Sequence, residues 1–169
     1  MSSIPDDHRR DAPQAVACAV VTVSDTRTAQ TDVGGQAVEE LLVGAGHPVV
    51  ERRIVADDAG QIEQEVSRLV DGGRAEAILL TGGTGLSRRD TTPDVLARLI
   101  DRPIPGYGEL LRWLSYEQIG PAAMLSRATG GLIGRVVVLS MPGSPAAVRL
   151  AMERVILPEL GHLVREAQR

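Results

Sequence analysis

Short apolar runs alternate with amphipathic segments along most of the chain. Three of these runs, at residues 15–23, 76–81 and 135–140, are rich in Val, Ile and Leu and bounded by polar residues. Runs of this length and composition predict strands that are covered on both faces. A fourth strand is predicted at residues 48–55.

Helical patterns follow the predicted strands at 15–23, 48–55 and 76–81. Apolar residues recur at helical spacing within 33–42, and again after Asp57 and Asp58, either of which can cap the second helix. Thr92 is predicted as the N-cap of a third helix, with Pro93 in its first turn. Strands that alternate with helices predict a mostly parallel sheet with right-handed crossovers, and therefore a three-layer α/β/α sandwich.

The second half of the chain gives weaker signals. Residues 101–109 are predicted as a Pro/Gly connector, and 109–120 as an amphipathic helix. The segment 128–135 holds too much glycine for a helix and is predicted as irregular structure or a hairpin. A helix at 146–156 follows the last strand, and Pro158 is expected to separate it from a final short helix.

Length and composition favour one domain. The chain has 169 residues, of which 43% are hydrophobic, enough to build one core. Without an internal repeat or a low-complexity linker, we expect a flexible N-terminal tail at 1–14 and a single domain at 15–169. The tail lacks the apolar segment of a signal peptide, and no later apolar run reaches membrane-spanning length. We therefore expect a cytoplasmic protein that does not bind membranes.

Composition also excludes several classes of function. The net charge is −4 and aromatic residues make up 2% of the chain, which argues against nucleic-acid binding. All 18 basic residues are Arg, so neither a P-loop lysine nor a catalytic lysine is available. The three histidines are scattered, which gives a zinc site or a Ser-His-Asp triad little support. Cys18 lies in an apolar run and is predicted to be a buried, unreactive thiol.

Candidate chemistry lies where the predicted strands end. The loop that follows the strand at 76–81, residues 81–92, is longer than most strand-to-helix loops. Its glycines at 82, 83 and 85 let consecutive amides face one anion. A tight turn is the alternative for this glycine cluster. Arg88 and Arg89 are either solvated or bind a phosphate.

Aspartates accompany these strand ends. Asp25, Asp57 and Asp90 each follow a strand, and the carboxyl ends of parallel strands share one edge of the sheet. One or two carboxylates beside phosphates form a typical Mg²⁺ site. The alternative roles are structural: a helix cap for Asp57 and a local turn for Asp25.

Five segments of the chain stand out together: VTVSDTR (21–27), LLTGGTGLSRRDTTPD (79–94), PGYGELLR (105–112), LSRATGG (125–131) and LSMPGSP (139–145). In this order they resemble the MoaB/Mog family of molybdenum cofactor biosynthesis proteins, and they are closer to its MoaB branch.

The resemblance implies a molybdopterin-binding α/β domain that transfers AMP from Mg-ATP to the terminal phosphate of molybdopterin and releases pyrophosphate. It implies that Asp57 and Asp90 are catalytic and organise Mg²⁺ and the triphosphate. The implied substrate-binding residues are Ser24, Asp25, Thr81, Gly82, Gly83, Thr84, Gly85, Thr92, Pro142, Gly143 and Ser144.

Two alternatives to the enzyme remain. One is a carrier that binds molybdopterin or its precursor without adenylylating it. The other is an oligomeric scaffold, because family members form trimers or hexamers. Trp113 and Tyr116 are candidates for contacts between subunits.

Overall fold

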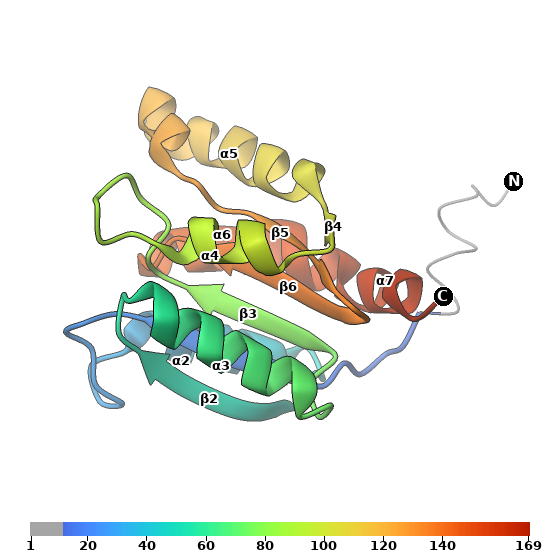
Figure 1. The fold of residues 1–169 in the computed structure, drawn as a ribbon. Helices are drawn as coiled ribbons and strands as arrows, with labels where there is room; N and C mark the ends of the chain where they lie inside the picture. Colours follow the sequence, from blue (N-terminus) through green and yellow to red (C-terminus); the bar gives the residue numbers. More distant parts are fainter. Residues whose placement is uncertain (1–11) are drawn as a thin grey trace, which may run out of the picture.

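A six-stranded sheet lies between two layers of helices in the computed structural model, which describes residues 12–169 (Figure 1). The order of the strands is β2-β1-β3-β6-β5-β4; β2, β1, β3 and β6 are parallel, β5 pairs antiparallel with β6, and β4 pairs antiparallel with β5. The predicted fold class is therefore confirmed. The strands are β1 (Cys18–Val23), β2 (Val49–Val55), β3 (Ala77–Thr81), β4 (Arg102–Pro103), β5 (Gly130–Ile133) and β6 (Val136–Met141).

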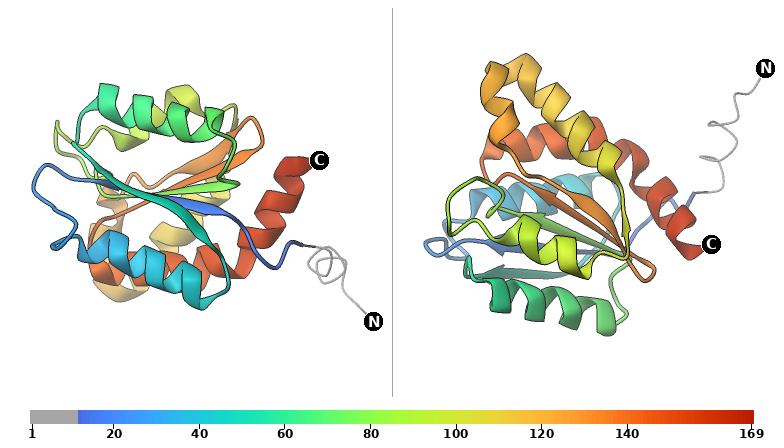
Figure 2. Two further views of the ribbon diagram at one scale, coloured as in Figure 1. Left: turned by 90° about the horizontal axis from the view of Figure 1, so that it is seen from below. Right: turned by 45° about the horizontal axis from the view of Figure 1, so that its top comes forward.

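Helices α3 and α4 cover one face of the sheet, and α2, α5, α6 and α7 cover the other (Figure 2). Two short segments extend this second layer: a 3₁₀ helix, η1, follows α5, and a π-helical turn, η2, joins α6 to α7. The helices are α2 (Val33–Gly44), α3 (Ala59–Asp71), α4 (Thr92–Leu99), α5 (Pro105–Ile119), η1 (Gly120–Leu125), α6 (Pro145–Ala151), η2 (Met152–Ile156) and α7 (Leu157–Gln168).

The alternation of side chains along each strand produces two cores. On β1, Val21 packs with Ile62 of α3 and Leu96 of α4, whereas Val20 packs on the opposite face with Leu42 of α2. All six residues of β1 and all five of β3 are buried, as expected for central strands covered on both faces.

The topology places a crevice between β1 and β3. From β1 the chain crosses to β2 on one side, and then returns past β1 to form β3 on its other side. Such a change of direction opens a crevice beyond the carboxyl ends of the two strands, where ligands of open α/β sheets bind. The loops at residues 24–32 and 82–91 project from this edge (Figure 1).

Helix α5 differs from its prediction. It begins at Pro105, not at residue 109, and β4 occupies part of the predicted connector. Proline suits the first turn of a helix because its missing N–H has no partner there, which explains the earlier start. The uncertain segment 128–135 is a hairpin, in which β5 pairs with β6.

Two further predictions about helices are wrong. Thr92 is not an N-cap: it is the first residue of α4, and its hydroxyl donates to the carbonyl of Gly82. Pro158 does not separate two helices, because the chain stays helical from α6 through η2 into α7. The wider π turn directly before Pro158 accommodates a residue that cannot donate a helical hydrogen bond.

The start of the domain and the absence of membrane-spanning helices were also predicted from the sequence. β1 begins at Cys18, three residues later than the predicted start at 15. Most of the tail predicted at 1–14 lies outside the described residues. Within residues 12–169, every helix is too short or too polar to cross a membrane.

Candidate functional site

Two clefts adjoin each other at the carboxyl edge of the sheet. The first, the strand-end cleft, measures about 430 Å³ and lies in the crevice between β1 and β3. Backbone from the ends of both strands, the first turn of α2 and the turn after β6 form its walls. It is lined by Thr22, Val23, Ser24, Thr26, Arg27, Asp32, Gly34, Thr81, Gly82, Gly143, Ser144 and Pro145.

The second, the loop cleft, measures about 340 Å³ and lies between the glycine loop and the end of α5. It shares Gly143 and Ser144 with the strand-end cleft, so the turn after β6 separates the two spaces. It is lined by Gly83, Thr84, Gly85, Asp90, Ser115, Ile119, Ala122, Ala123, Leu125, Ser126, Pro142, Gly143, Ser144 and Ala147.

Two of the three glycines in the loop have the positive φ angles that the sequence predicts, and Gly85 does not. Gly82 and Gly83 have φ angles of +99° and +63°, which side-chain-bearing residues rarely adopt. The carbonyls of residues 82–85 all accept hydrogen bonds from the protein: Gly82 and Gly83 from Thr92, and Thr84 and Gly85 from Arg127.

The amides of the same loop are available to a ligand. Within residues 12–169, the N–H groups of Gly83, Thr84 and Gly85 have no hydrogen-bond partner. All three residues line the loop cleft. Consecutive free amides beside inward-bonded carbonyls are the arrangement of an anion-binding nest.

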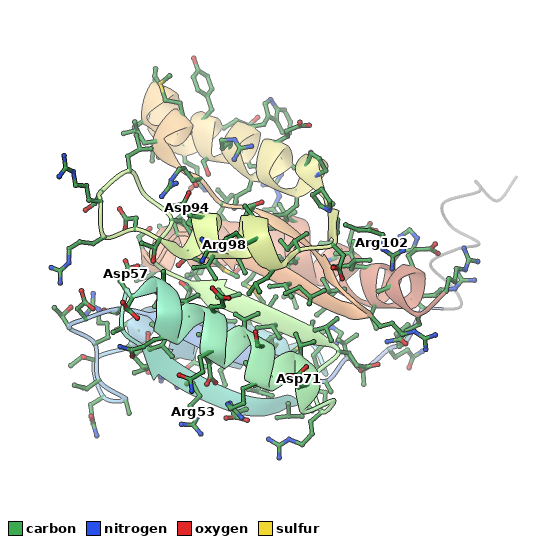
Figure 3. The ribbon with its side chains drawn as sticks, viewed as in Figure 1. Arg53, Asp57, Asp71, Asp94, Arg98 and Arg102 are labelled. Atoms are coloured by element: carbon green, nitrogen blue, oxygen red, sulfur yellow. The ribbon has the colours of Figure 1, made fainter. Side chains whose placement is uncertain are left out.

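Three aspartates from three loops gather beside the nest. Asp25 accepts a 3.0 Å hydrogen bond from the amide of Asp57 and pairs with Arg89 at 2.7 Å. Asp57 precedes α3 (Figure 3) and accepts from the amide and hydroxyl of Thr91, at 3.3 and 3.4 Å. Asp90 accepts a 2.8 Å hydrogen bond from the amide of Ser87. The structure thus brings Asp25, Asp57 and Asp90 together, as the strand ends predicted.

Electrostatics distinguish Asp57. Partial burial raises the pKa of its carboxyl above the ordinary value, and the hydrogen bonds from Thr91 oppose this effect. The nearby carboxylates of Asp90 and Asp25 raise the pKa further. An ionised Asp57 is therefore held at a free-energy cost, which a bound cation would relieve.

The remaining predicted residues divide into lining and supporting groups. Ser24 accepts from the amides of Thr26 and Arg27, and Ser144 caps α6 by accepting from Ala147. Thr81 donates to the Pro142 carbonyl at 3.3 Å. Thr92 is fully buried, and its hydroxyl holds the Gly82 carbonyl.

The predictions overlooked Asp32, which lines the strand-end cleft. Its carboxylate accepts from the hydroxyl of Thr22 at 2.7 Å and from the amide of Gly35 at 2.9 Å, and pairs with Arg52 at 3.2 Å. Only 3% of the residue is exposed. An Asp directly before the first helix of a βαβ unit is a helix-capping signal. Asp32 could have been recognised in the sequence by this signal.

The predictions also gave Arg127 no role. Its side chain contacts Gly85, Asp90 and Asp94, all in or beside the long loop. Arg127 lies in the LSRATGG segment, which carries part of the family resemblance. No local sequence pattern indicates that its side chain contacts residues so distant in the chain.

Other candidate chemistry is not supported. Cys18 is buried as predicted, and burial raises the pKa of its thiol to about 12. His47 is buried, and its Nδ1 accepts a 3.1 Å hydrogen bond from the amide of Val16. Among the described residues, no three His, Cys, Asp or Glu side chains form a group that could hold a metal ion.

Comparisons with known proteins agree with this architecture. A family model described as a probable molybdopterin binding domain matches residues 19–162. Molybdenum cofactor biosynthesis protein B of Bacillus cereus is 51% identical over 164 residues, which cover 96% of this chain and 97% of that protein.

Solved structures give the same result. A crystal structure of a molybdenum cofactor biosynthesis protein B has a TM-score of 0.91 at 52% identity, covering 94% of this chain and 99% of that one. The molybdopterin biosynthesis enzyme MoaB from Thermus thermophilus has a TM-score of 0.80 at 34% identity, covering 90% and 96%. The chain therefore belongs to the MoaB family of molybdenum cofactor biosynthesis proteins.

Proposed function

We propose that this protein acts in the cytoplasm as a molybdopterin adenylyltransferase, which transfers AMP from Mg-ATP to the terminal phosphate of molybdopterin. The observation that carries the proposal is the anion nest: three free amides, at Gly83, Thr84 and Gly85, line a cleft together with Asp90. Membership of the MoaB family supports molybdopterin as one substrate.

The pair of clefts supports a transfer reaction. A reaction that joins two substrates needs two adjoining spaces with the reacting atoms between them. The strand-end cleft and the loop cleft meet at Gly143 and Ser144, where a Cβ on Gly143 would lie 3.3 Å from the Gly82 Cα. A side chain at residue 143 would press against the backbone of Gly82, so the glycine keeps the boundary between the two clefts thin.

The carboxylates fit a magnesium ion held jointly with phosphates. Mg²⁺ in such sites takes one or two carboxylates and completes its coordination with phosphate oxygens and water. Asp57 and Asp90 supply two carboxylates, and their mutual repulsion favours a cation. When bound, the ion would neutralise charge on the triphosphate and polarise the α-phosphorus.

The residues of the chain would position the reactants. The nest amides would hold phosphate oxygens, and Asp57 and Asp90 would fix the metal-bound triphosphate in line with the attacking oxygen. An oxygen of the terminal molybdopterin phosphate attacks the α-phosphorus, and the bond to the bridging oxygen breaks. Pyrophosphate leaves with that electron pair, and no covalent enzyme intermediate is needed.

We also propose a homo-oligomer, a trimer or hexamer. Helix α5 leaves Trp113, Tyr116 and Ile119 exposed by 61%, 58% and 60%. Met124 and Leu125 of η1 continue this apolar surface with exposures of 76% and 50%. Contiguous exposed apolar residues of this size are typical of interaction surfaces.

A turnover assay tests the enzyme. Purified protein is incubated with molybdopterin, ATP and Mg²⁺, and adenylylated molybdopterin and pyrophosphate are measured with time. We expect both products in equal amounts, and neither when Mg²⁺ is omitted. Tight binding of molybdopterin without product formation would contradict the enzyme and favour a carrier.

A further inference from the structure

Arg127 lies at the centre of the loop that carries Asp90. Its Nε donates to the Gly85 carbonyl at 2.8 Å, and its Nη2 donates to the Asp90 carbonyl. Its Nη1 lies 3.0 Å from both carboxylate oxygens of Asp94 in α4. One guanidinium therefore contacts the start of the loop, the aspartate and the helix that follows.

The geometry of these contacts requires arginine. The three acceptor groups come from different parts of the loop, and a rigid planar fork reaches all of them at once. The backbone amide of Arg127 also donates to the Thr84 carbonyl at 2.9 Å. The contacts to Thr84 and Gly85 turn these carbonyls inward, so Arg127 sets the orientation of the nest as well as the position of Asp90.

The contact between Gly85 and Asp90 is close. A Cβ added to Gly85 would lie 2.8 Å from Asp90 Oδ2, so the carboxylate is packed against the nest backbone. Because Arg127 holds the carbonyls of both residues, a shift of its guanidinium would change the spacing between nest and carboxylate.

Arg127 is itself held from two sides. Arg112 of α5 donates through Nη1 to the carbonyls of Ser126 and Ala128, at 3.4 and 3.2 Å. Gly108 provides space for this contact, since a Cβ there would lie 2.6 Å from the Ala128 carbonyl oxygen. Thr129, two residues after Arg127, exchanges hydrogen bonds with Ser140 of the buried strand β6.

We propose that Arg127 is a positioning residue that fixes the Asp90 carboxylate relative to the nest, and that Arg112 fixes the segment carrying Arg127. The proposal rests on the proposed adenylyl transfer for its kinetic consequence. Its structural consequence, a less ordered loop when Arg127 is changed, is independent of that activity.

The first test measures the loop without substrates. Arg127→Met is compared with wild type by hydrogen–deuterium exchange, and we expect faster exchange in residues 84–94, with α3 unchanged. Arg127→Lys should give an intermediate result because a lysine reaches fewer acceptors. The matched control is Arg98→Met, which removes another α4 contact: Arg98 donates to the Asp94 carbonyl and pairs with Glu63. Unchanged exchange in 84–94 would overturn the proposal.

The second test measures turnover at a temperature where every variant is folded. A displacement of about 1 Å can cost about 100-fold in rate, so we expect a loss of that order in the kcat of Arg127→Met. The variant should also need more Mg²⁺ for half-maximal rate, with a smaller change for Arg112→Met and none for Arg98→Met. If Arg127 only stabilises the fold, Arg127→Met will lower the melting temperature but leave kcat and the Mg²⁺ dependence unchanged. That result would overturn the proposal.

The two tests separate the proposals. If wild type forms no adenylylated product, the proposed function fails, and the exchange experiment still decides whether Arg127 orders the loop. If wild type is active and Arg127→Met retains its kcat, the enzyme is real and the role of Arg127 as a positioning residue is wrong.

Discussion

The carboxylate of Asp25 accepts a 3.0 Å hydrogen bond from the backbone amide of Asp57. Asp25 also pairs with Arg89 at 2.7 Å, so one side chain connects the loops that follow β1, β2 and β3. These three loops surround the carboxyl edge of the sheet where the two clefts lie. The position of Asp57 is therefore set by tertiary contacts as well as by the strand that precedes it.

We expect Asp57→Asn to abolish adenylyl transfer and to leave the protein at least as stable as wild type at about pH 7. The pKa of Asp57 is raised above its ordinary value of 3.8, so its ionisation lowers the stability of the fold as the pH rises from that value to the folded-state pKa, and the penalty is complete above it. Asparagine removes this penalty and keeps an oxygen that accepts from Thr91.

The stability gain should disappear below about pH 3.8, where the wild-type carboxyl is protonated in both states. Urea unfolding of both proteins at neutral and acid pH measures it. Asp71→Asn, at the other end of α3 (Figure 3), is the matched control for the loss of one carboxylate beside this helix. A clear loss of stability for Asp57→Asn at neutral pH would contradict the prediction.

Asp90→Asn is expected to reduce kcat by roughly 100- to 1000-fold, the usual effect of removing one preorganised electrostatic group. The substitution keeps an oxygen that accepts from the Ser87 amide, so the local turn should persist. Steady-state kinetics over a range of Mg²⁺ concentrations test it, with circular dichroism to check folding. Unchanged turnover would remove Asp90 from the catalytic residues even if the enzyme is real.

Gly82→Ala should destabilise the protein more than Gly134→Ala does. Both residues have positive φ angles, +99° and +58°, which cost a side-chain-bearing residue about 1–2 kcal/mol. At Gly82 the new Cβ would also collide with the Val23 carbonyl, whereas it meets nothing within 4 Å at Gly134. Thermal unfolding compares the two, and equal losses would show that close packing at Gly82 is unimportant.

Stability should fall as the pH decreases below about 6.5, because of His47. Burial lowers its pKa below that ordinary value, and its Nδ1 accepts from the Val16 amide only while the ring is neutral. A lowered histidine pKa contributes stability that is present above pH 6.5 and is lost as the pH falls through the folded-state pKa. Unfolding free energies measured across this range should lose the step in His47→Gln and keep it in His162→Gln.

Trp113→Glu is expected to dissociate the proposed oligomer, because a charge in an apolar subunit interface is costly to bury. Light scattering gives the mass of each variant. Val43→Glu is a matched control: Val43 on α2 is 59% exposed, and Trp113 is 61% exposed. A monomeric wild type would contradict the oligomer.

Local sequence patterns determined much of the fold. The apolar runs of β1, β3 and β6 could be located because a strand covered on both faces needs apolar residues at successive positions. The residues at the strand ends followed from the same patterns, because parallel strands bring their carboxyl ends to one edge. The positive φ angles of Gly82 and Gly83 were predictable for a local reason: glycine adopts them without strain.

Only the tertiary structure decided how these residues act together. The sequence pattern predicted Thr92 as a helix N-cap. In the structure its hydroxyl instead donates to the carbonyl of Gly82, ten residues earlier, and supports the loop. Arg127 meets Asp90 across 37 residues, and Asp25 meets Asp57 across 32. Contacts of that separation depend on how strands and helices pack, so the pattern of neighbouring residues does not reveal them. The sequence by itself determined which groups reach the edge of the sheet, and packing determined which of them touch.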